Sequence, residues 1–336
     1  MNVYNKLHKR LLQGLLWIFC WICTHHAVLC QSTRYQNVQT PTNTIDTLNK
    51  KRLNTLLISG GTSYILGSTG LYLSWYQDYP RSNFHFFDDL SEWQQMDKVG
   101  HIYSSYAQSE LIYRGLRWSG VSEDQAIGYG ILGSALAQTT IEIMDGFSSE
   151  WGFSLGDFGA NILGLASFGL QQKIWQEQRF RLKFSTTPRN YDALADRLGS
   201  EINLSNRAQD LYGNTALESM LKDYNAQTYW LSVNPASFYS NTWIPDWLNI
   251  AVGYGADNMF GGFDNSWEHQ GEIIDINLST QRYRQFYISL DLDLDRINTN
   301  SKIIRTLLDI FNYIKVPFSA IEINTLGQVK FHLIHF

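Results

Sequence analysis

Acidic, histidine and amide side chains recur at helical spacings between residues 97 and 164, within stretches that are otherwise apolar or small. Residues three and four positions apart share one face of an α-helix, so each group would present its polar side chains in one direction. The candidate residues are Asp97, His101, Glu142, Asp145, Asp157 and Asn161. Such a set could perform acid–base chemistry, with His101 titrating near neutral pH and a carboxylate orienting it.

The same residue types could also hold a metal. A histidine and two or three carboxylates that converge between helices can bind a divalent cation, and the candidate ligands are His101, Glu142, Asp145 and Asp157. The sequence requires no cofactor, although it leaves a divalent metal open. It contains no G-x-S-x-G, no H-E-x-x-H and no phosphate-binding glycine loop. The common hydrolase mechanisms and nucleotide binding therefore have no support.

A structural role explains part of this set as well. Asp157 follows Ser154 by three residues, which is the spacing of a helix capping box. Asp97 would lie at the start of its own helix, where a carboxylate complements the macrodipole. His101, on a helix that faces other helices, could be a hydrogen-bonded core residue. We therefore expect a buried polar network that fixes helix packing, with a functional site as the alternative.

The elements that would position these residues can be placed from sequence patterns. The helices that would carry them are predicted over 96–118, 122–144 and 154–176. Ser122 with Gln125, and Ser154 with Asp157, are capping patterns at the starts of the second and third helices. Before them, the uncharged stretch 53–76 predicts a buried or membrane-associated helix, and its length would also span a bilayer.

The pattern changes near residue 179, where strands replace helices. The predicted strands are 183–187, 228–233, 248–256, 286–294, 320–324 and 329–336. In 286–294 apolar and polar residues alternate throughout, so one face should be buried and the other wet. An amphipathic helix is predicted over 303–314, ended by Pro317. The fold class is therefore α+β, with a helical domain over 50–178 and an antiparallel β-rich domain over 179–336.

The N-terminus has the features of a secretory signal peptide, predicted over 1–30 and followed by a polar linker over 31–49. Three basic residues, Lys6, Lys9 and Arg10, precede an apolar run. An uncleaved anchor helix is the alternative. A lipid anchor on Cys30 is a further one, although that processing requires a small residue where this chain has Leu29.

Cleavage before Gln31 would leave a mature chain without cysteine, because all three cysteines lie in the signal segment. Disulfides and thiol chemistry would then be excluded. The formal net charge would change from -5 to -8. Nucleic acid is not an expected partner, since an acidic chain has no electrostatic attraction for phosphates.

The order of polar residues resembles that of a known family. The motifs are Asp97-Lys98-x-x-His101, Glu142-x-x-Asp145 and Ser154-x-x-Asp157-x-x-x-Asn161-x-x-Gly164. They resemble the DUF2279 family of predicted periplasmic lipoproteins and, more remotely, VanZ-like membrane proteins. Two later stretches, 223–234 and 253–259, resemble the longer Bacteroidetes form. The resemblance implies an envelope location and brings no established activity with it.

These observations together predict an exported protein in the periplasm or outer membrane of a Gram-negative cell envelope. The leading function is a non-enzymatic module that binds or scaffolds a membrane or cell-wall component. The alternative is an envelope hydrolase or transferase, metal-dependent in one version, that uses His101 and the carboxylates. Neither version involves nucleic acid or nucleotide as a partner.

Overall fold

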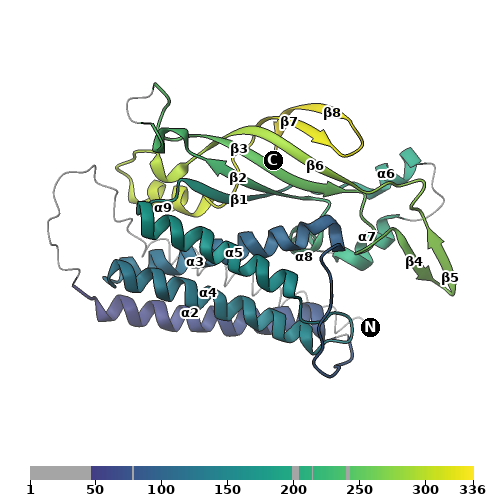
Figure 1. Cartoon of the computed structure of the whole chain (residues 1–336), viewed down its shortest axis with the longest axis horizontal. Coiled ribbons are helices and arrows are strands. Elements are labelled where there is room, and N and C mark those ends of the chain that lie inside the picture. Colours follow the sequence, from purple (N-terminus) through teal and green to yellow (C-terminus); the bar gives the residue numbers. More distant parts are fainter. Residues whose placement is uncertain (1–46, 78, 199–203, 214, 240–242) are drawn as a thin grey trace. The chain divides into compact units, whose positions relative to one another are not determined.

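The structure is a computed structural model that describes residues 47–77, 79–198, 204–213, 215–239 and 243–336. The predicted signal peptide and most of the predicted linker lie outside the described residues. The helices are α2 (Lys50–Leu71), α3 (Met96–Trp118), α4 (Glu123–Gly146), α5 (Leu155–Trp175), α6 (Tyr191–Leu198), α7 (Leu204–Tyr212), α8 (Ala216–Lys222) and α9 (Lys302–Phe311). The strands are β1 (Phe180–Thr186), β2 (Gln227–Val233), β3 (Leu248–Asp257), β4 (Ser266–His269), β5 (Glu272–Asp275), β6 (Tyr283–Leu292), β7 (Phe318–Asn324) and β8 (Val329–His335). Figure 1 labels these elements, and the α+β class is confirmed.

The chain forms two compact units, each built from separate stretches of sequence. The helical unit comprises the described residues up to Asp88, Ser104–Gln178 and Ile297–Phe311. The sheet unit comprises Asp89–Tyr103, Arg179–Arg296 and Asn312–Phe336. The predicted domain boundaries stay predictions.

Buried side chains in the helical unit are largely small or polar. Its apolar cluster contains Leu116, Val121 and Ala126. Gly130 on α4 approaches α3 so closely that a Cβ there would lie 2.8 Å from the carbonyl oxygen of Ser109. Nearby, Ser134 donates a hydrogen bond to a backbone oxygen of α3 at 2.9 Å. Small residues thus let the helices come close enough for polar side chains to bond to neighbouring backbone.

The first helix differs in part from what its sequence indicates. The stretch 53–76 becomes α2 followed by a short π-helical turn, and none of the residues of α2 is buried. The expectation of a buried helix is therefore wrong. Among the described residues, no helix is both long and apolar enough to cross a membrane. Association of α2 with a membrane surface stays a prediction.

Capping explains where the next helices begin. Ser154 accepts a hydrogen bond from the backbone N–H of Asp157 at 3.0 Å, so the predicted cap of α5 is present. Helix α4 also begins where predicted, after Ser122. There, however, the serine hydroxyl donates to the side chain of Gln125 at 2.9 Å and makes no cap bond to the backbone.

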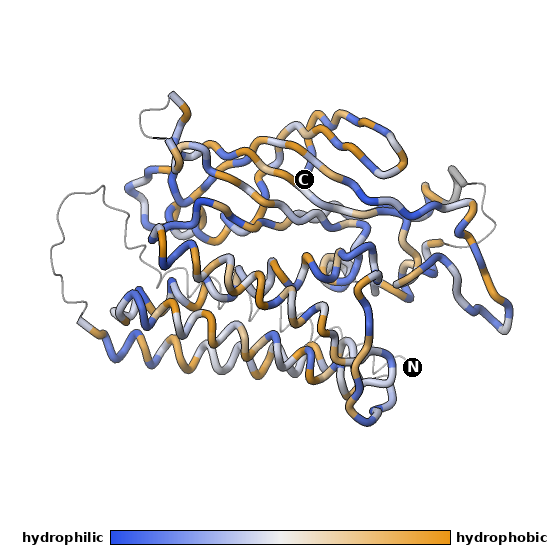
Figure 2. The backbone as a smooth tube through the Cα atoms, in the orientation of Figure 1, coloured by the Kyte–Doolittle hydropathy of each residue, from blue (hydrophilic) through white to orange (hydrophobic). Residues whose placement is uncertain are grey.

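The sheet unit contains a six-stranded antiparallel sheet in the order β1-β2-β3-β6-β7-β8, and a separate hairpin of β4 and β5. The alternation predicted over 286–294 is present in β6, and Figure 2 shows hydropathy alternating along this part of the chain. The burial, however, is the reverse of the usual arrangement. Polar Gln285, Ser289 and Asp291 are buried, whereas apolar Phe286 and Ile288 are 45% and 55% exposed.

Candidate functional site

The first turn of α3 lies against the sheet within the sheet unit. Gly100 faces Tyr229 of β2, and a Cβ at this glycine would lie 2.9 Å from the tyrosine hydroxyl oxygen. Met96 packs with Ala256 and Met259 in one buried apolar cluster. A glycine and a buried methionine therefore hold the start of α3 near β2 and β3, and polar residues of the same turn lie beside them.

The backbone just before α3 is strained. Trp93, Gln94 and Gln95 have φ values of 46°, 53° and 63°, in the left-handed region that favours glycine. Bonds within the sheet unit hold this conformation: the N–H of Trp93 donates to the carbonyl of Gly262 at 2.7 Å. Arg284 donates to the Gln95 side chain at 2.6 Å. Strain of this kind persists only where surrounding contacts enforce it, and it concentrates at functional sites.

The strained segment and α3 bring together a group of ionisable residues that we call the carboxylate cluster: Asp89, Glu92, Asp97, Lys98 and His101. Lys98 Nζ lies 2.8 Å from an oxygen of Asp89 and 3.2 Å from one of Asp97. His101 Nε2 is 3.8 Å from the other Asp97 oxygen. Two predicted site residues, Asp97 and His101, are thus neighbours in the structure.

Asp97 remains ionised in this cluster. Burial opposes its charge, but His101 and Lys98 nearby, with a hydrogen bond from Tyr224, outweigh that effect and lower the pKa of its carboxyl. The Tyr224 hydroxyl donates to Asp97 at 2.7 Å. Asp97 can therefore orient His101 as a permanent anion, which is the pairing that acid–base chemistry with a histidine requires.

The pKa of the Glu92 carboxyl is shifted in the opposite direction. Burial, reinforced by the negative charges of Asp97 and Asp89, raises the pKa of its carboxyl to about 7. A carboxyl group with this pKa can both donate and accept a proton near neutral pH. Sequence reasoning missed Asp89 and Glu92, because both precede the helix predicted over 96–118 and lie outside the predicted elements. Their three-residue spacing just before a predicted helix was the available signal.

The other predicted residues belong to the helical unit. Glu142 of α4 is fully buried and accepts a hydrogen bond from the amide of Asn161 of α5 at 3.4 Å. Asp145 accepts one from the Tyr76 hydroxyl at 2.6 Å. Asp157 is buried in the first turn of α5. Glu142 with Asn161 matches the expected polar network, while a metal site made from His101, Glu142, Asp145 and Asp157 stays a prediction.

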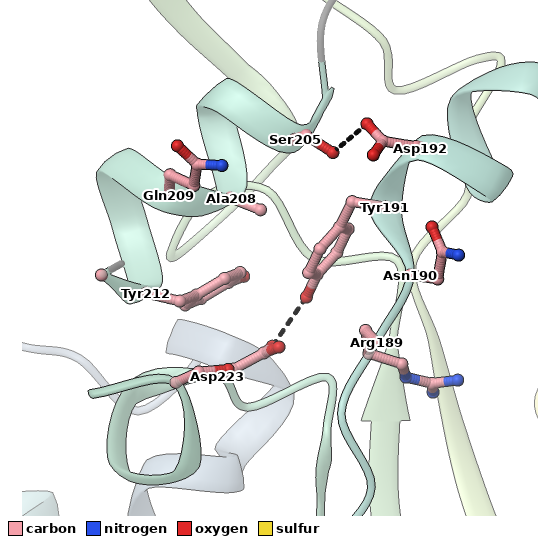
Figure 3. Close-up of a pocket in the computed structure, with 11 residues that line it drawn as sticks. Arg189, Asn190, Tyr191, Asp192, Ser205, Ala208, Gln209, Tyr212 and Asp223 are labelled. Atoms are coloured by element: carbon pink, nitrogen blue, oxygen red, sulfur yellow. Dashed lines mark hydrogen bonds between the residues drawn. The ribbon is translucent and has the colours of Figure 1, made fainter. Parts of the chain in front are cut away.

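A polar pocket lies elsewhere in the sheet unit, among α6, α7 and α8 (Figure 3). It has a volume of about 210 Å³, and its lining includes Tyr191, Tyr212 and Asp223. The Tyr191 hydroxyl donates to Asp223 at 2.7 Å, as the dashed line in Figure 3 shows. Sequence analysis gave no indication of this pocket, because its residues come from short helices that show no sustained periodicity.

Comparison with known proteins links part of the chain to a family. Residues 85–173 match the DUF2279 family model, described as a predicted periplasmic lipoprotein. The resemblance to DUF2279 seen in the sequence motifs is thereby confirmed, and an envelope location has support, whereas the more remote similarity to VanZ-like proteins stays a prediction. The matched stretch contains all of the carboxylate cluster and the predicted site residues of α4 and α5. Neither the curated proteins nor the solved structures gave a match.

Proposed function

Because residues 85–173 match a family of predicted periplasmic lipoproteins, we propose that this protein is a non-enzymatic binding module of the cell envelope. It attaches to the hydrocarbon surface of a membrane through the apolar face of its six-stranded sheet. The observation that carries this proposal is the reversed polarity of that sheet.

One row of paired residues crosses all six strands on this face. The strand register aligns Leu182, Leu231, Val252, Ile288, Ile321 and Phe331 as successive partners from β1 to β8. From Leu231 to Phe331 these side chains are between 42% and 69% exposed. The neighbouring residues Ile250, Phe286 and Leu290 extend the exposed apolar surface on both sides of the row. We call this surface the apolar sheet face.

The opposite face of the sheet is polar and internally paired. Lys183 and Asp291, both fully buried, form an ion pair at 2.9 Å. Ser232 donates to Asp291 at 2.6 Å, and the indole N–H of Trp230 donates to Ser185 at 2.9 Å. Removing one partner of such a buried pair costs on the order of 3–5 kcal/mol, because the other charge is left buried without a partner. The exposed apolar side chains lie opposite this buried and paired face.

Water is an unfavourable environment for such a surface. Antiparallel sheets usually bury their apolar face and expose the polar one. Monomeric proteins rarely expose continuous apolar patches beyond a few hundred Å², and larger ones mark interaction surfaces. A bilayer matches this face in chemistry, since it offers hydrocarbon without specific hydrogen-bonding partners. The match of residues 85–173 to a family of predicted periplasmic lipoproteins supports a compartment bounded by membranes.

The helical unit offers independent support. Exposed apolar side chains also occur along its helices: Leu57, Ile58, Ile65, Leu132, Leu136, Leu155, Leu163, Leu170 and Ile174. Each is more than half exposed. A membrane surface would therefore suit the exposed apolar side chains of both units.

Flotation of vesicles tests the proposal. The chain from Gln31 onward is used, so that a lipid on Cys30 cannot supply the binding. With vesicles of phosphatidylethanolamine and phosphatidylglycerol we expect the wild type to float with the lipid. Val252→Asp combined with Ile288→Asp should reduce the floating fraction about tenfold or more, because two apolar side chains that would contact the hydrocarbon become charged.

The matched control carries the same charge change outside the six-stranded sheet. Ile273 and Leu278 are 82% and 104% exposed, and Ile273→Asp with Leu278→Asp should float like the wild type. Loss of flotation in both double variants, or no flotation of the wild type, contradicts the proposal. A wild type that stays off vesicles but forms dimers dissociated by Val252→Asp and Ile288→Asp would instead assign this face to a second copy.

One observation favours the enzymatic alternative, a hydrolase or transferase. Glu92, with a pKa of about 7, lies in the same cluster as His101 and the ionised Asp97. Melting of His101→Ala with and without a chelator separates the two functions. A strong drop in Tm that is insensitive to chelator favours a structural cluster. If His101→Ala melts at the same or a higher temperature than the wild type, His101 is kept for chemistry and not for stability. If a chelator lowers the Tm of the wild type but not that of the variant, His101 binds a metal.

A further inference from the structure

The lining of the pocket among α6, α7 and α8 contains a buried acid, Asp223. Asp223 is 1% exposed. Its Oδ1 accepts hydrogen bonds from the Tyr191 hydroxyl at 2.7 Å and from the backbone N–H of Asn225 at 3.1 Å. A side-chain hydrogen bond from Asn225 also lowers the pKa of this carboxyl. A carboxylate can accept several hydrogen bonds, so a ligand in the pocket that supplies a further charged donor would be favoured.

The tyrosine hydroxyls beside Asp223 already donate to other groups. Tyr212 donates to the carbonyl of Met259 at 2.6 Å, and the Asn225 amide donates to that carbonyl and to both tyrosine oxygens at 2.9–3.1 Å. Ser205 donates to Asp192, the second bond drawn in Figure 3. Around Asp223 the wall therefore offers oxygen acceptors, to which a ligand can donate.

The one cation in the lining does not neutralise Asp223. Arg189 donates to Asp257 at 2.6 Å and to the carbonyl of Asn225 at 2.8 Å, so its guanidinium is engaged elsewhere. Figure 3 shows this side chain directed away from Tyr191 and Asp223. Consistent with this, burial raises the pKa of the Asp223 carboxyl, and Arg189 lowers it less than burial raises it.

The size of the cavity limits the ligand. A volume of about 210 Å³ is below the 300–1,000 Å³ that is usual for drug-sized ligands. One sugar ring or one amino acid is of suitable size. We propose that this pocket binds a small molecule through a primary ammonium group that donates to Asp223, with the oxygens of Tyr191 and Tyr212 beside it.

Matched pairs of probes test the inference by isothermal titration on the chain from Gln31 onward. Glucosamine and glucose differ by an ammonium group, and so do Nα-acetyl-lysine and Nα-acetyl-norleucine, whose α-amino groups are blocked. We expect at least one ammonium probe to bind about tenfold or more tightly than its neutral counterpart. Asp223→Asn should remove that preference, because it keeps the shape and removes the charge.

Asp192→Asn is the matched control, since Asp192 is an exposed carboxylate of the same lining. It should keep the preference for the ammonium probe. If Asp223→Asn fails to fold, Ser219→Leu fills the pocket from α8 and should abolish binding with the charge of Asp223 intact. Equal affinity for charged and neutral probes, no binding of either, or equal loss in Asp192→Asn would overturn the inference. None of these results depends on vesicle binding.

Discussion

In the carboxylate cluster, the pKa values of two neighbouring carboxyl groups are shifted in opposite directions. Asp97 and Glu92 lie in one buried group with a single lysine, Lys98, which pairs with Asp89 and Asp97. Favourable contacts from Lys98 and His101 lower the pKa of Asp97, whereas burial and like charge raise that of Glu92. Residues whose environments separate their pKa values are candidates for acid and base roles. Near neutral pH Asp97 is therefore a permanent anion, and Glu92 carries an exchangeable proton.

Glu92→Gln should change the pH dependence of stability. The pKa of Glu92 rises from 4.5 to about 7 on folding, so the folded state binds the extra proton between these values. The wild type therefore loses stability as the pH rises through this window, and the variant does not. Between pH 4.5 and 8, the free energy of unfolding of the variant should rise by about 1–2 kcal/mol relative to that of the wild type, after allowance for the partial exposure of Glu92.

Urea unfolding of the wild type and of Glu92→Gln, at pH 4.5 and at pH 8, measures this difference in unfolding free energy. Glu272→Gln removes an exposed carboxylate of the same unit and should leave the pH dependence unchanged. A Glu92→Gln profile parallel to that of the wild type would show that Glu92 ionises normally.

At the scale of the element, the sheet combines an apolar outer row with a polar inner face, and its inner face leaves little room. Trp230 is 1% exposed and packs against Tyr287 with ring centroids 5.7 Å apart. His335 of β8 stacks on Tyr287 at 4.3 Å, so residues from three strands converge on this face. Gly253 is paired with Trp230 across β2 and β3. The indole covers this glycine.

Gly253→Ala should destabilise the sheet. A Cβ at this position would lie 2.7 Å from two indole carbons of Trp230, and this side chain is too tightly packed to move freely. Overpacking of this kind costs about 1–3 kcal/mol. Gly255→Ala is the matched control on the same strand and face, because its nearest contact would be an ordinary 3.4 Å. Equal Tm values for the two variants would contradict the packing described here.

At the scale of the whole molecule, each compact unit combines distant stretches of sequence. The sheet unit takes Asp89–Tyr103 from the helical half of the sequence, and the helical unit takes Ile297–Phe311 from the sheet half. Contacts of this range close late and slow the folding of a chain. The contacts of Gly100 with β2 and of Met96 with β3 join stretches more than a hundred residues apart.

Export predicts a defined mature chain. If the signal peptide is cleaved before Gln31, protein recovered from envelope fractions should begin at Gln31 and contain no cysteine. A mass increase on Cys30 that Cys30→Ala removes would instead show lipid attachment. Intact-mass analysis distinguishes these results, and a full-length chain would show an uncleaved anchor.

The sequence by itself determined the helices around Asp97, Glu142 and Asp157, most of the strands, and the α+β class, because these depend on local periodicity and capping. It also brought Asp97 and His101 together, since residues four apart on a helix are neighbours. It did not find Asp89 and Glu92, or the pocket around Asp223, because those groups meet only through tertiary contacts.

The contrast between what the sequence predicts and what tertiary packing decides is clearest in β6. A period of two determined that Phe286 and Ile288 share one face and that Gln285 and Asp291 share the other. The alternation has the same period whichever face is buried, so the sequence alone could not decide which face of β6 packs inward. Tertiary packing buried the polar face, where Lys183 meets Asp291 and the carboxylate is satisfied, and left the apolar face outward.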